Sequence, residues 1–176
     1  RLKTTFANGV SVDEDDVVYI VVTVKTQLVN DSPTSIVGTM ADASTFTAVE
    51  AENMNVAKYG DMFAGGWSAR WPFTTKGSKA SFVVDIKDTK AIIGFGCDAY
   101  AVNDYTVSVS TDKTTWTELG NSAEHKAMRD DDYNNIYVLY GGVRCRYVKF
   151  EFNLNEGDWS WDYGWAGMSG LFLYFQ

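Results

Sequence analysis

The sequence has a single histidine, His125, among its 176 residues. That histidine lies in the polar stretch 121–126, with no evident nucleophile beside it. A catalytic triad and a histidine-rich metal site are therefore excluded, and only carboxylate chemistry remains open to an enzyme. Glycoside cleavage needs two opposed carboxyl groups, and no Asp or Glu pair is marked by the sequence as buried and facing another. We therefore predict a protein that is not an enzyme.

Cysteines are also scarce. Cys97 and Cys145 each lie in a strand-like run and have no CxxC spacing, which argues against zinc. Two alternatives remain for them: a disulfide across the fold, or two buried thiols. The second is the interpretation that we favour.

Basic residues are outnumbered, with 15 Lys and Arg against 23 Asp and Glu, which gives a formal net charge of −8 and a sequence pI of about 4.5. Nucleic acids and anionic membranes are bound through an excess of Lys and Arg. We therefore expect no nucleic-acid partner and disfavour a membrane partner. The acidic balance suits neutral ligands, cations or simple solubility.

Long hydrophobic runs are absent. The longest, Val17–Val24, is much too short to span a bilayer and is typical of a buried strand. The chain begins at Arg1 without a signal peptide, so we expect a processed form or an excised fragment. Apolar residues make up 45% of the chain, and the length favours one domain with a sizeable core, with or without an appendage.

Period-two alternation of apolar residues is common, and helical periodicity is rare. Four segments carry the alternation or a buried-strand pattern: Ser81–Ile86, Tyr105–Ser110, Arg146–Phe152 and Leu171–Phe175, the last expected to be buried on both faces. Such strands, separated by Gly, Asn and Asp clusters, predict an all-β fold, an antiparallel β-sandwich or jelly roll. A short helix is predicted over Thr45–Ala57, where Phe46, Val49 and Val56 share one helical face.

Aromatic residues make up 15% of the chain, and residues 155–165 concentrate them: four large rings and three acids stand among eleven residues. One interpretation is a core plug, in which Trp159 and Trp161, two positions apart, point together into the core. The other is a binding platform, in which the rings stack on sugar C–H groups while acids accept hydrogen bonds from hydroxyls.

Two segments, Tyr105–Leu119 and Arg146–Phe152, resemble the discoidin, or coagulation factor 5/8 type C, family. The family's strand, Ser-x-Asp turn, Trp and closing Arg-Tyr-Val strand are all matched. Further pieces in the family's order are Trp67–Trp71, Phe82–Ile86 and Gly167–Tyr174, so that the resemblance runs from Asp61 to Phe175. It implies a galactose-binding-domain-like β-sandwich over residues 36–176, with residues 1–35 as an N-terminal extension or extra strands.

The resemblance also carries local expectations. Trp116 is expected to fold back over its hairpin onto the core. Lys113 stands where the family usually has Gly, and because Lys disfavours a positive φ, a different turn is expected. Many carbohydrate-binding members hold a structural calcium with an Asp, here Asp61, and a Glu in the last strand. Gly170 occupies the position of that Glu, so a calcium cofactor is doubtful. Three consecutive acids, Asp130–Asp132, are interpreted as a solvated loop.

In the family, the loop before the last strand lies at the end of the sandwich that commonly contacts ligand. The candidate ligand-binding residues are Trp159, Trp161, Tyr163, Trp165, Asp162, Glu156, Trp67, Arg70, Tyr100 and Asn103. The function predicted is a non-catalytic carbohydrate-binding module for a glycan or polysaccharide, extracellular or at the cell surface, within a larger multidomain protein. The alternative is an adhesion or assembly domain that docks its aromatic loop on protein. Membrane binding through apolar loop spikes, known in the family, is disfavoured by the charge.

Overall fold

The computed structural model describes residues 39–40, 47–56, 70–128 and 136–176. Within these ranges the chain forms strands joined by turns and by two short 3-10 helices, η2 (Lys126–Met128) and η3 (Trp159–Trp161). The strands are β1 (Thr39–Met40), β2 (Thr47–Glu52), β3 (Trp71–Pro72), β4 (Lys79–Tyr100), β5 (Val102–Ser110), β6 (Thr117–Asn121), β7 (Tyr137–Leu154) and β8 (Gly167–Phe175). Every pairing between them is antiparallel, which confirms the all-β prediction. The predicted strand at Val17–Val24 and the boundary at residue 35 lie outside the described residues.

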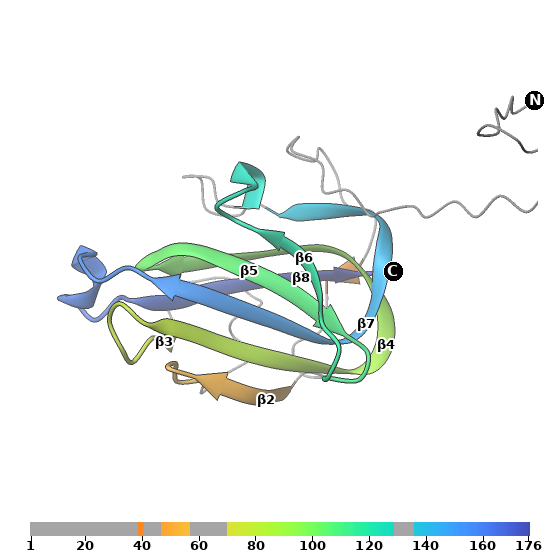
Figure 1. Cartoon of the computed structure of the whole chain (residues 1–176), viewed down its shortest axis with the longest axis horizontal. Helices are drawn as coiled ribbons and strands as arrows, with labels where there is room; N and C mark the ends of the chain where they lie inside the picture. The colour runs from red at the N-terminus through yellow and green to blue at the C-terminus, as the bar shows by residue number, and fades with distance from the viewer. Residues whose placement is uncertain (1–38, 41–46, 57–69, 129–135) are drawn as a thin grey trace, which may run out of the picture.

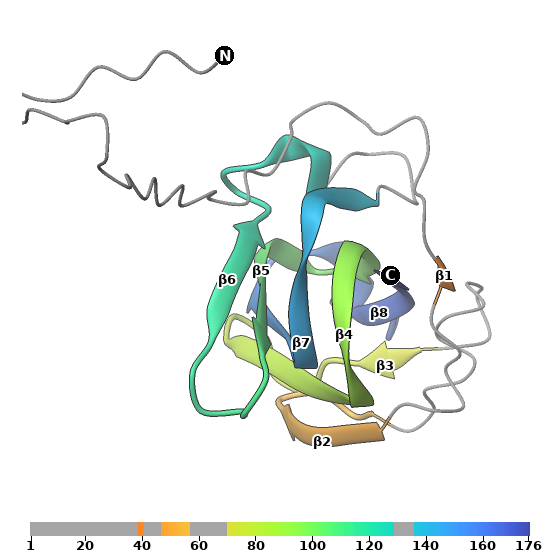
Figure 2. The ribbon, with the colours of Figure 1, turned by 90° about the vertical axis from the view of Figure 1, so that its right-hand side faces the viewer.

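Two long strands, β4 and β7, pass through both layers of the sandwich. In one layer, the first part of β4 lies between β2 and the last part of β7. The last part of β7 also pairs with β5, and β5 pairs in turn with β6. In the other layer, the last part of β4 lies between the start of β7 and β8. The strand β8 also pairs with β1 and with β3. Figure 1 shows both long strands bending at the right-hand end, and Figure 2 looks onto that end.

The bend is fixed by one buried carboxylate. Asp85 is 6% exposed, and its two oxygens accept hydrogen bonds of 3.1 Å each from Nε and Nη2 of Arg146 on β7. The backbone N–H of Lys87, a residue with φ of +69°, donates to the same carboxylate at 2.8 Å. The pKa of Asp85 is lowered, chiefly by its hydrogen bonds with Arg146, which outweigh the effect of burial. The ionised carboxylate therefore joins β4 and β7 where both strands turn.

The core between the layers is rich in aromatic rings. Phe82 stacks on Phe150 at a centroid distance of 5.1 Å and meets the edge of Trp71 at the same distance. The alternation predicted from sequence is confirmed on its inward side; the buried residues are Phe82, Val84, Ile86, Tyr105, Val107, Val109, Val148, Phe150 and Phe152. Over Leu171–Phe175 only one face is fully buried, because Phe172 and Tyr174 are half-buried. The prediction of burial on both faces is therefore wrong.

The prediction of a helix over Thr45–Ala57 is also wrong. Residues 47–52 form β2, which pairs with β4 from Thr47 opposite Asp85 to Glu52 opposite Ser81. Most of β2 is exposed, Val49 included, whereas Val56 lies beyond β2 and packs against the core, so the two do not share one buried face. The open edge of β4 supplies backbone partners instead, and this tertiary pairing overrides the weak local pattern.

The turn between β5 and β6 departs from two expectations. Lys113 has φ of +64°, the left-handed conformation that glycine favours, so the expectation that lysine would avoid it is wrong. Asp112 stabilises the turn, because its carboxylate accepts the backbone N–H groups of Thr114 and Thr115 at 2.8 Å. Trp116 does not join the core: it is half-buried, with the ammonium of Lys149 4.8 Å from its ring centroid.

Both cysteines are thiols, as favoured from sequence, but only Cys145 is buried as expected, because Cys97 is half-buried. Cys145 is fully buried in β7, and burial raises its pKa to about 12. Of the residues that the structure describes, none belong to a helix with the length and apolar character that crossing a membrane would require.

Candidate functional site

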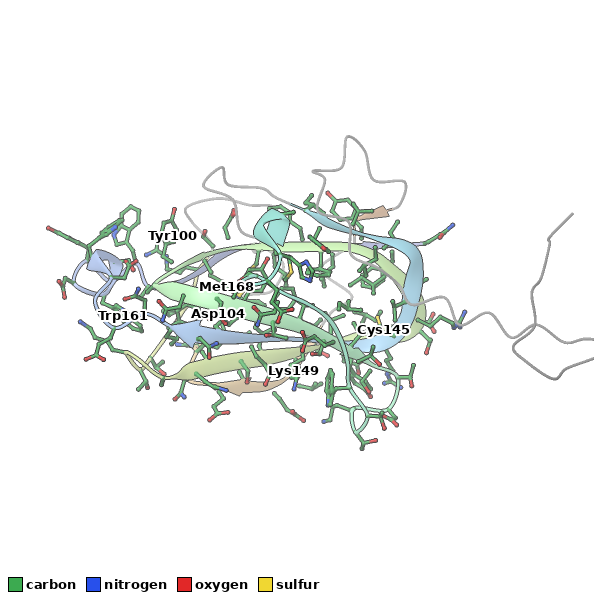
Figure 3. The ribbon with its side chains drawn as sticks, turned by 45° about the horizontal axis from the view of Figure 1, so that its top comes forward. Tyr100, Asp104, Cys145, Lys149, Trp161 and Met168 are labelled. Carbon is green, nitrogen blue, oxygen red and sulfur yellow. The ribbon has the colours of Figure 1, made fainter. Side chains whose placement is uncertain are left out.

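The aromatic stretch forms the connection between β7 and β8 at one end of the sandwich. In Figure 3, Trp161 of this connection lies at the same end as Tyr100, the last residue of β4, while Cys145 lies toward the other end. The turn from β4 to β5 at Ala101 also belongs to this end, because its carbonyl accepts the backbone N–H of Asn155 at 2.7 Å.

The connection is held together by its own hydrogen bonds. The Asp158 carboxylate caps η3 by accepting the backbone N–H of Ser160 at 2.8 Å. The carbonyl of Ser160 accepts the backbone N–H groups of Trp165 and Ala166 at 2.6 and 3.2 Å. At the base, Asn155 accepts the Gly157 N–H through its side chain. These bonds fix the loop, so ring positions within it are set before any ligand arrives.

Trp161 is the ring that serves the fold. Its indole N–H donates to the backbone carbonyl of Asn155, and its ring packs against the core at half burial. The ammonium of Lys76 lies 5.9 Å from the Trp161 ring centroid and 3.4 Å from the carboxylate of Asp162. The core-plug interpretation thus holds for Trp161 alone.

The other three rings form one group, which we call the aromatic cluster: the exposed Trp159 and Tyr163 and the half-buried Trp165. Trp159 is 56% exposed and Tyr163 72%, and the two rings meet at a centroid distance of 6.0 Å. The ring centroids of Trp159 and Trp165 are 6.3 Å apart. In the described residues, Val49 is the one other large hydrophobic side chain that is exposed. A 3-10 helix has about three residues per turn, so Trp159 and Trp161 point in different directions. The core-plug interpretation, in which both rings enter the core together, therefore does not hold for Trp159.

Arg70 borders the aromatic cluster. Its guanidinium carbon lies 4.9 Å from the Trp165 ring centroid, and Nη1 donates to the carbonyl of Gly164 at 3.0 Å. One face of Trp165 is therefore covered by Arg70, and Trp165 is half-buried. The faces left open for a ligand belong chiefly to Trp159 and Tyr163.

The remaining candidates have different positions. Glu156 lies over Gly77, where an added Cβ would sit 3.1 Å from Glu156 Oε2. Asn103 accepts a 3.0 Å hydrogen bond from the side chain of Asn155, so both residues belong to the base of the loop. Tyr100 is half-buried opposite Gly167 in β8. Trp67, Asp61 and residues 130–132 lie outside the described residues.

Sequence reasoning missed two supporting residues, Asn155 and Lys76. Asn155 has bonds to four backbone or side-chain groups at the base of the loop. Asn at the end of a strand is a common turn residue, and that was the only signal that the sequence offered. Lys76 lies 86 positions from its partner Asp162, and no local pattern joins them.

The described residues contain no group of three or more His, Cys, Asp or Glu side chains suited to a metal ion. At Gly170, an added Cβ would meet the Asp98 carboxylate at 2.8 Å, so Asp98 fills the space into which a longer side chain would project. His125 lies against the buried Tyr137 at a ring distance of 5.7 Å.

No protein-family model and no curated relative matches the sequence. Solved structures do match. The C-terminal domain of a Bacteroides fragilis chitobiase superposes with a TM-score of 0.55 at 12% identity over 78% of this chain and 98% of its own. A family 32 carbohydrate-binding module of Clostridium perfringens NanJ, in complex with galactose, gives 0.55 at 12% identity over 78% and 99%. The prediction of a discoidin-like, galactose-binding-domain-like β-sandwich is therefore confirmed as a fold.

Two further matches extend the comparison. The CpGH89CBM32-5 domain of C. perfringens, in complex with GalNAc-β-1,3-galactose, gives a TM-score of 0.56 at 14% identity over 77% of this chain and 99% of its own. A Ruminococcus gnavus GH29 fucosidase in complex with fucose gives 0.53 at 12% identity over 75% of this chain, but only 25% of the enzyme. The same fold thus occurs there as a minor part of a longer chain.

Proposed function

We propose that this domain is a non-catalytic carbohydrate-binding module that holds a glycan at the aromatic cluster. The observation that carries the proposal is the exposure of Trp159 and Tyr163 on a loop whose backbone is fixed by hydrogen bonds. Two large rings kept in water on a rigid support are costly unless they serve a partner. A sugar ring is a suitable partner because its C–H faces stack on indole and phenol rings.

Each residue has a distinct role in this proposal. The open face of Trp159 stacks on one sugar ring, and Tyr163 lines the rim and offers its hydroxyl to sugar hydroxyls. Arg70 supplies further N–H donors beside Trp165. Because the loop is ordered by Asp158 and Asn155 before binding, little conformational entropy is lost on association.

The fold comparison supports the same class of ligand, since matched domains were solved with galactose and with GalNAc-β-1,3-galactose. We further propose that the domain works outside the cell or at its surface, as one module of a larger protein. The fucosidase match, in which the fold covers a quarter of the chain, supports a modular setting.

The test is titration calorimetry with a panel of neutral and acidic oligosaccharides, on the wild type and on Trp159→Ala and Tyr163→Ala. We expect Trp159→Ala to weaken binding by about thirtyfold, the effect of removing a dominant aromatic contact. Trp116→Ala is the matched control, since Trp116 is half-buried in the β5–β6 turn, outside the cluster. Binding that survives Trp159→Ala unchanged would contradict the site.

The alternative function, docking of the aromatic loop on protein, predicts a different result. If no glycan binds and the protein self-associates with rising concentration, and if Trp159→Ala abolishes that association in sedimentation velocity, the aromatic cluster is a protein-docking surface. The glycan proposal is then wrong.

A further inference from the structure

The charge of Arg70 is not neutralised by any carboxylate in the described residues. Its interactions are the hydrogen bond to the Gly164 carbonyl and the contact with the Trp165 ring. Of the described cations at this end, Lys76 is paired with Asp162, and Lys79 is exposed on β4 opposite Asn153. Elsewhere Arg146 is paired with Asp85, and Lys113 with Glu50. Within the described residues Lys79, Lys90 and Arg144 form no ion pair either. What distinguishes Arg70 is its place: it is half-buried against Trp165, at the edge of the aromatic cluster.

From this we infer that the ligand carries a carboxylate on a sugar ring, as uronic and sialic acids do, and that Arg70 binds it while Trp159 stacks on a neighbouring ring. The inference rests on the proposed function and names its substrate class. A guanidinium has five N–H donors, and Arg70 uses one of them on Gly164. The donors that remain suit the two oxygens of a carboxylate, which a planar fork binds in a bidentate manner.

The side chain of Arg70 is held for this role. The contact with the Trp165 ring and the hydrogen bond to the Gly164 carbonyl together restrict the movement of the guanidinium. Arg70 is half-buried, and its contact with the indole displaces water from one face of its charge. Both conditions strengthen a charge-assisted hydrogen bond relative to one made by a solvated lysine.

Three carboxylates of the same loop would oppose an anionic ligand; two have partners of their own, and the third is directed to the turn at Gly77. Asp158 caps η3, and Asp162 is paired with Lys76. Glu156 lies over the turn at Gly77, between β3 and β4. Among the described residues, Arg70 is therefore the cation that contacts the aromatic cluster and keeps N–H donors unused.

The experiment compares acids with their neutral counterparts by calorimetry on the wild-type domain. One arm uses oligogalacturonides and the same oligomers as methyl esters; the other uses sialyllactose and lactose. We expect the acid to bind at least about tenfold more tightly than its neutral counterpart in one arm, the size of a charge-assisted hydrogen bond. The arm that responds distinguishes a uronate from a sialate. The preference should fall as salt is added.

Variants then assign the preference to one residue. Arg70→Gln should remove it and bring the acid and the neutral sugar to equal affinity, and Arg70→Lys should restore it only in part. Arg144→Gln is the matched control: it removes an equal charge from an exposed position next to Cys145, toward the other end of the sandwich, and should leave the preference intact. If Arg70→Gln misfolds by circular dichroism, Arg70→Lys carries the assignment, and an acid preference that Arg70→Lys leaves undiminished would overturn the role of Arg70.

The outcomes separate the two proposals. Neutral sugars that bind as tightly as their acids, with Trp159→Ala still weakening binding, would overturn the carboxylate inference and leave the glycan site standing. An acid preference that persists in Arg70→Gln would also overturn it. Failure of every oligosaccharide to bind would overturn the proposed function and, with it, this inference.

Discussion

Trp161 donates its indole N–H to the backbone carbonyl of Asn155, so the 3-10 helix of the β7–β8 connection is bonded to the base of its own loop. Two residues earlier, Trp159 has more than half of its surface in water. One tryptophan therefore stabilises the loop, and the other is presented by it. Stability and binding at this end can be separated by single substitutions.

Trp161→Ala should lower the free energy of unfolding by about 2 kcal/mol, less than the loss for a fully buried Trp because Trp161 is half-buried. Trp159→Ala should change it by less than about 0.5 kcal/mol, as exposed positions usually do. Urea unfolding followed by far-UV circular dichroism measures both. Equal losses in the two variants would mean that Trp159 also supports the fold.

Much of the sandwich was predictable because alternation is a strong local signal where one strand face is buried. The strands around Phe82, Val107 and Phe150 were found for this reason. Edge strand β2 was not, because its side chains are mostly exposed and its structure comes from pairing with β4. The bend was also beyond sequence reasoning, since Asp85 and Arg146 are 61 positions apart.

The site was predictable in composition but not in geometry. The aromatic stretch was identified as a candidate, yet assigning its rings requires the backbone. A two-residue spacing places side chains on one face in a strand, and on different faces in η3, where Trp159 and Trp161 diverge. Arg70 and Trp165 are 95 positions apart in the sequence, so no local sequence pattern predicts their contact.

Asp85→Asn should destabilise the domain by about 2 kcal/mol at neutral pH, because it leaves Arg146 without its ionic partner at the bend. Asp88→Asn, a neutralised exposed carboxylate on the same strand, is the control and should cost less than about 0.5 kcal/mol. The comparison uses urea unfolding of both variants. Similar losses would indicate that the bend responds to net charge rather than to this ion pair.

The same residue predicts a pH dependence. The pKa of Asp85 is lower in the folded state than its ordinary value of 3.8, so the unfolded chain binds the proton more readily. The stabilisation is complete above about pH 4 and is lost as the pH falls through the folded-state pKa. The gap in unfolding free energy between the wild type and Asp85→Asn should therefore shrink with acidification below that point. A difference in unfolding free energy that does not change with pH would show that the stabilisation does not come from ionised Asp85.

Two thiols per chain should react with Ellman's reagent in denaturant without reductant, because Cys97 and Cys145 are not joined. In the native Cys97→Ser variant, the remaining Cys145 should be unreactive. It is fully buried, and with a pKa of about 12 almost none of it is the reactive thiolate at neutral pH. Absence of reactive thiols in the denatured wild type would show a disulfide. Rapid native labelling of Cys145 would show that β7 opens locally.

Lys113 offers a test of backbone strain in the β5–β6 turn. Its φ of +64° is unfavourable for a side chain with a Cβ, and its ammonium forms a 2.7 Å ion pair with Glu50 on β2. Lys113→Ala loses the ion pair and keeps the strain, whereas Lys113→Gly loses the pair and relieves the strain. The glycine variant should therefore be more stable than the alanine variant by about 1 kcal/mol in urea unfolding. Because exposed pairs contribute little, it should at least match the wild type. Equal stability of the two variants would mean that the turn relaxes away from the left-handed conformation.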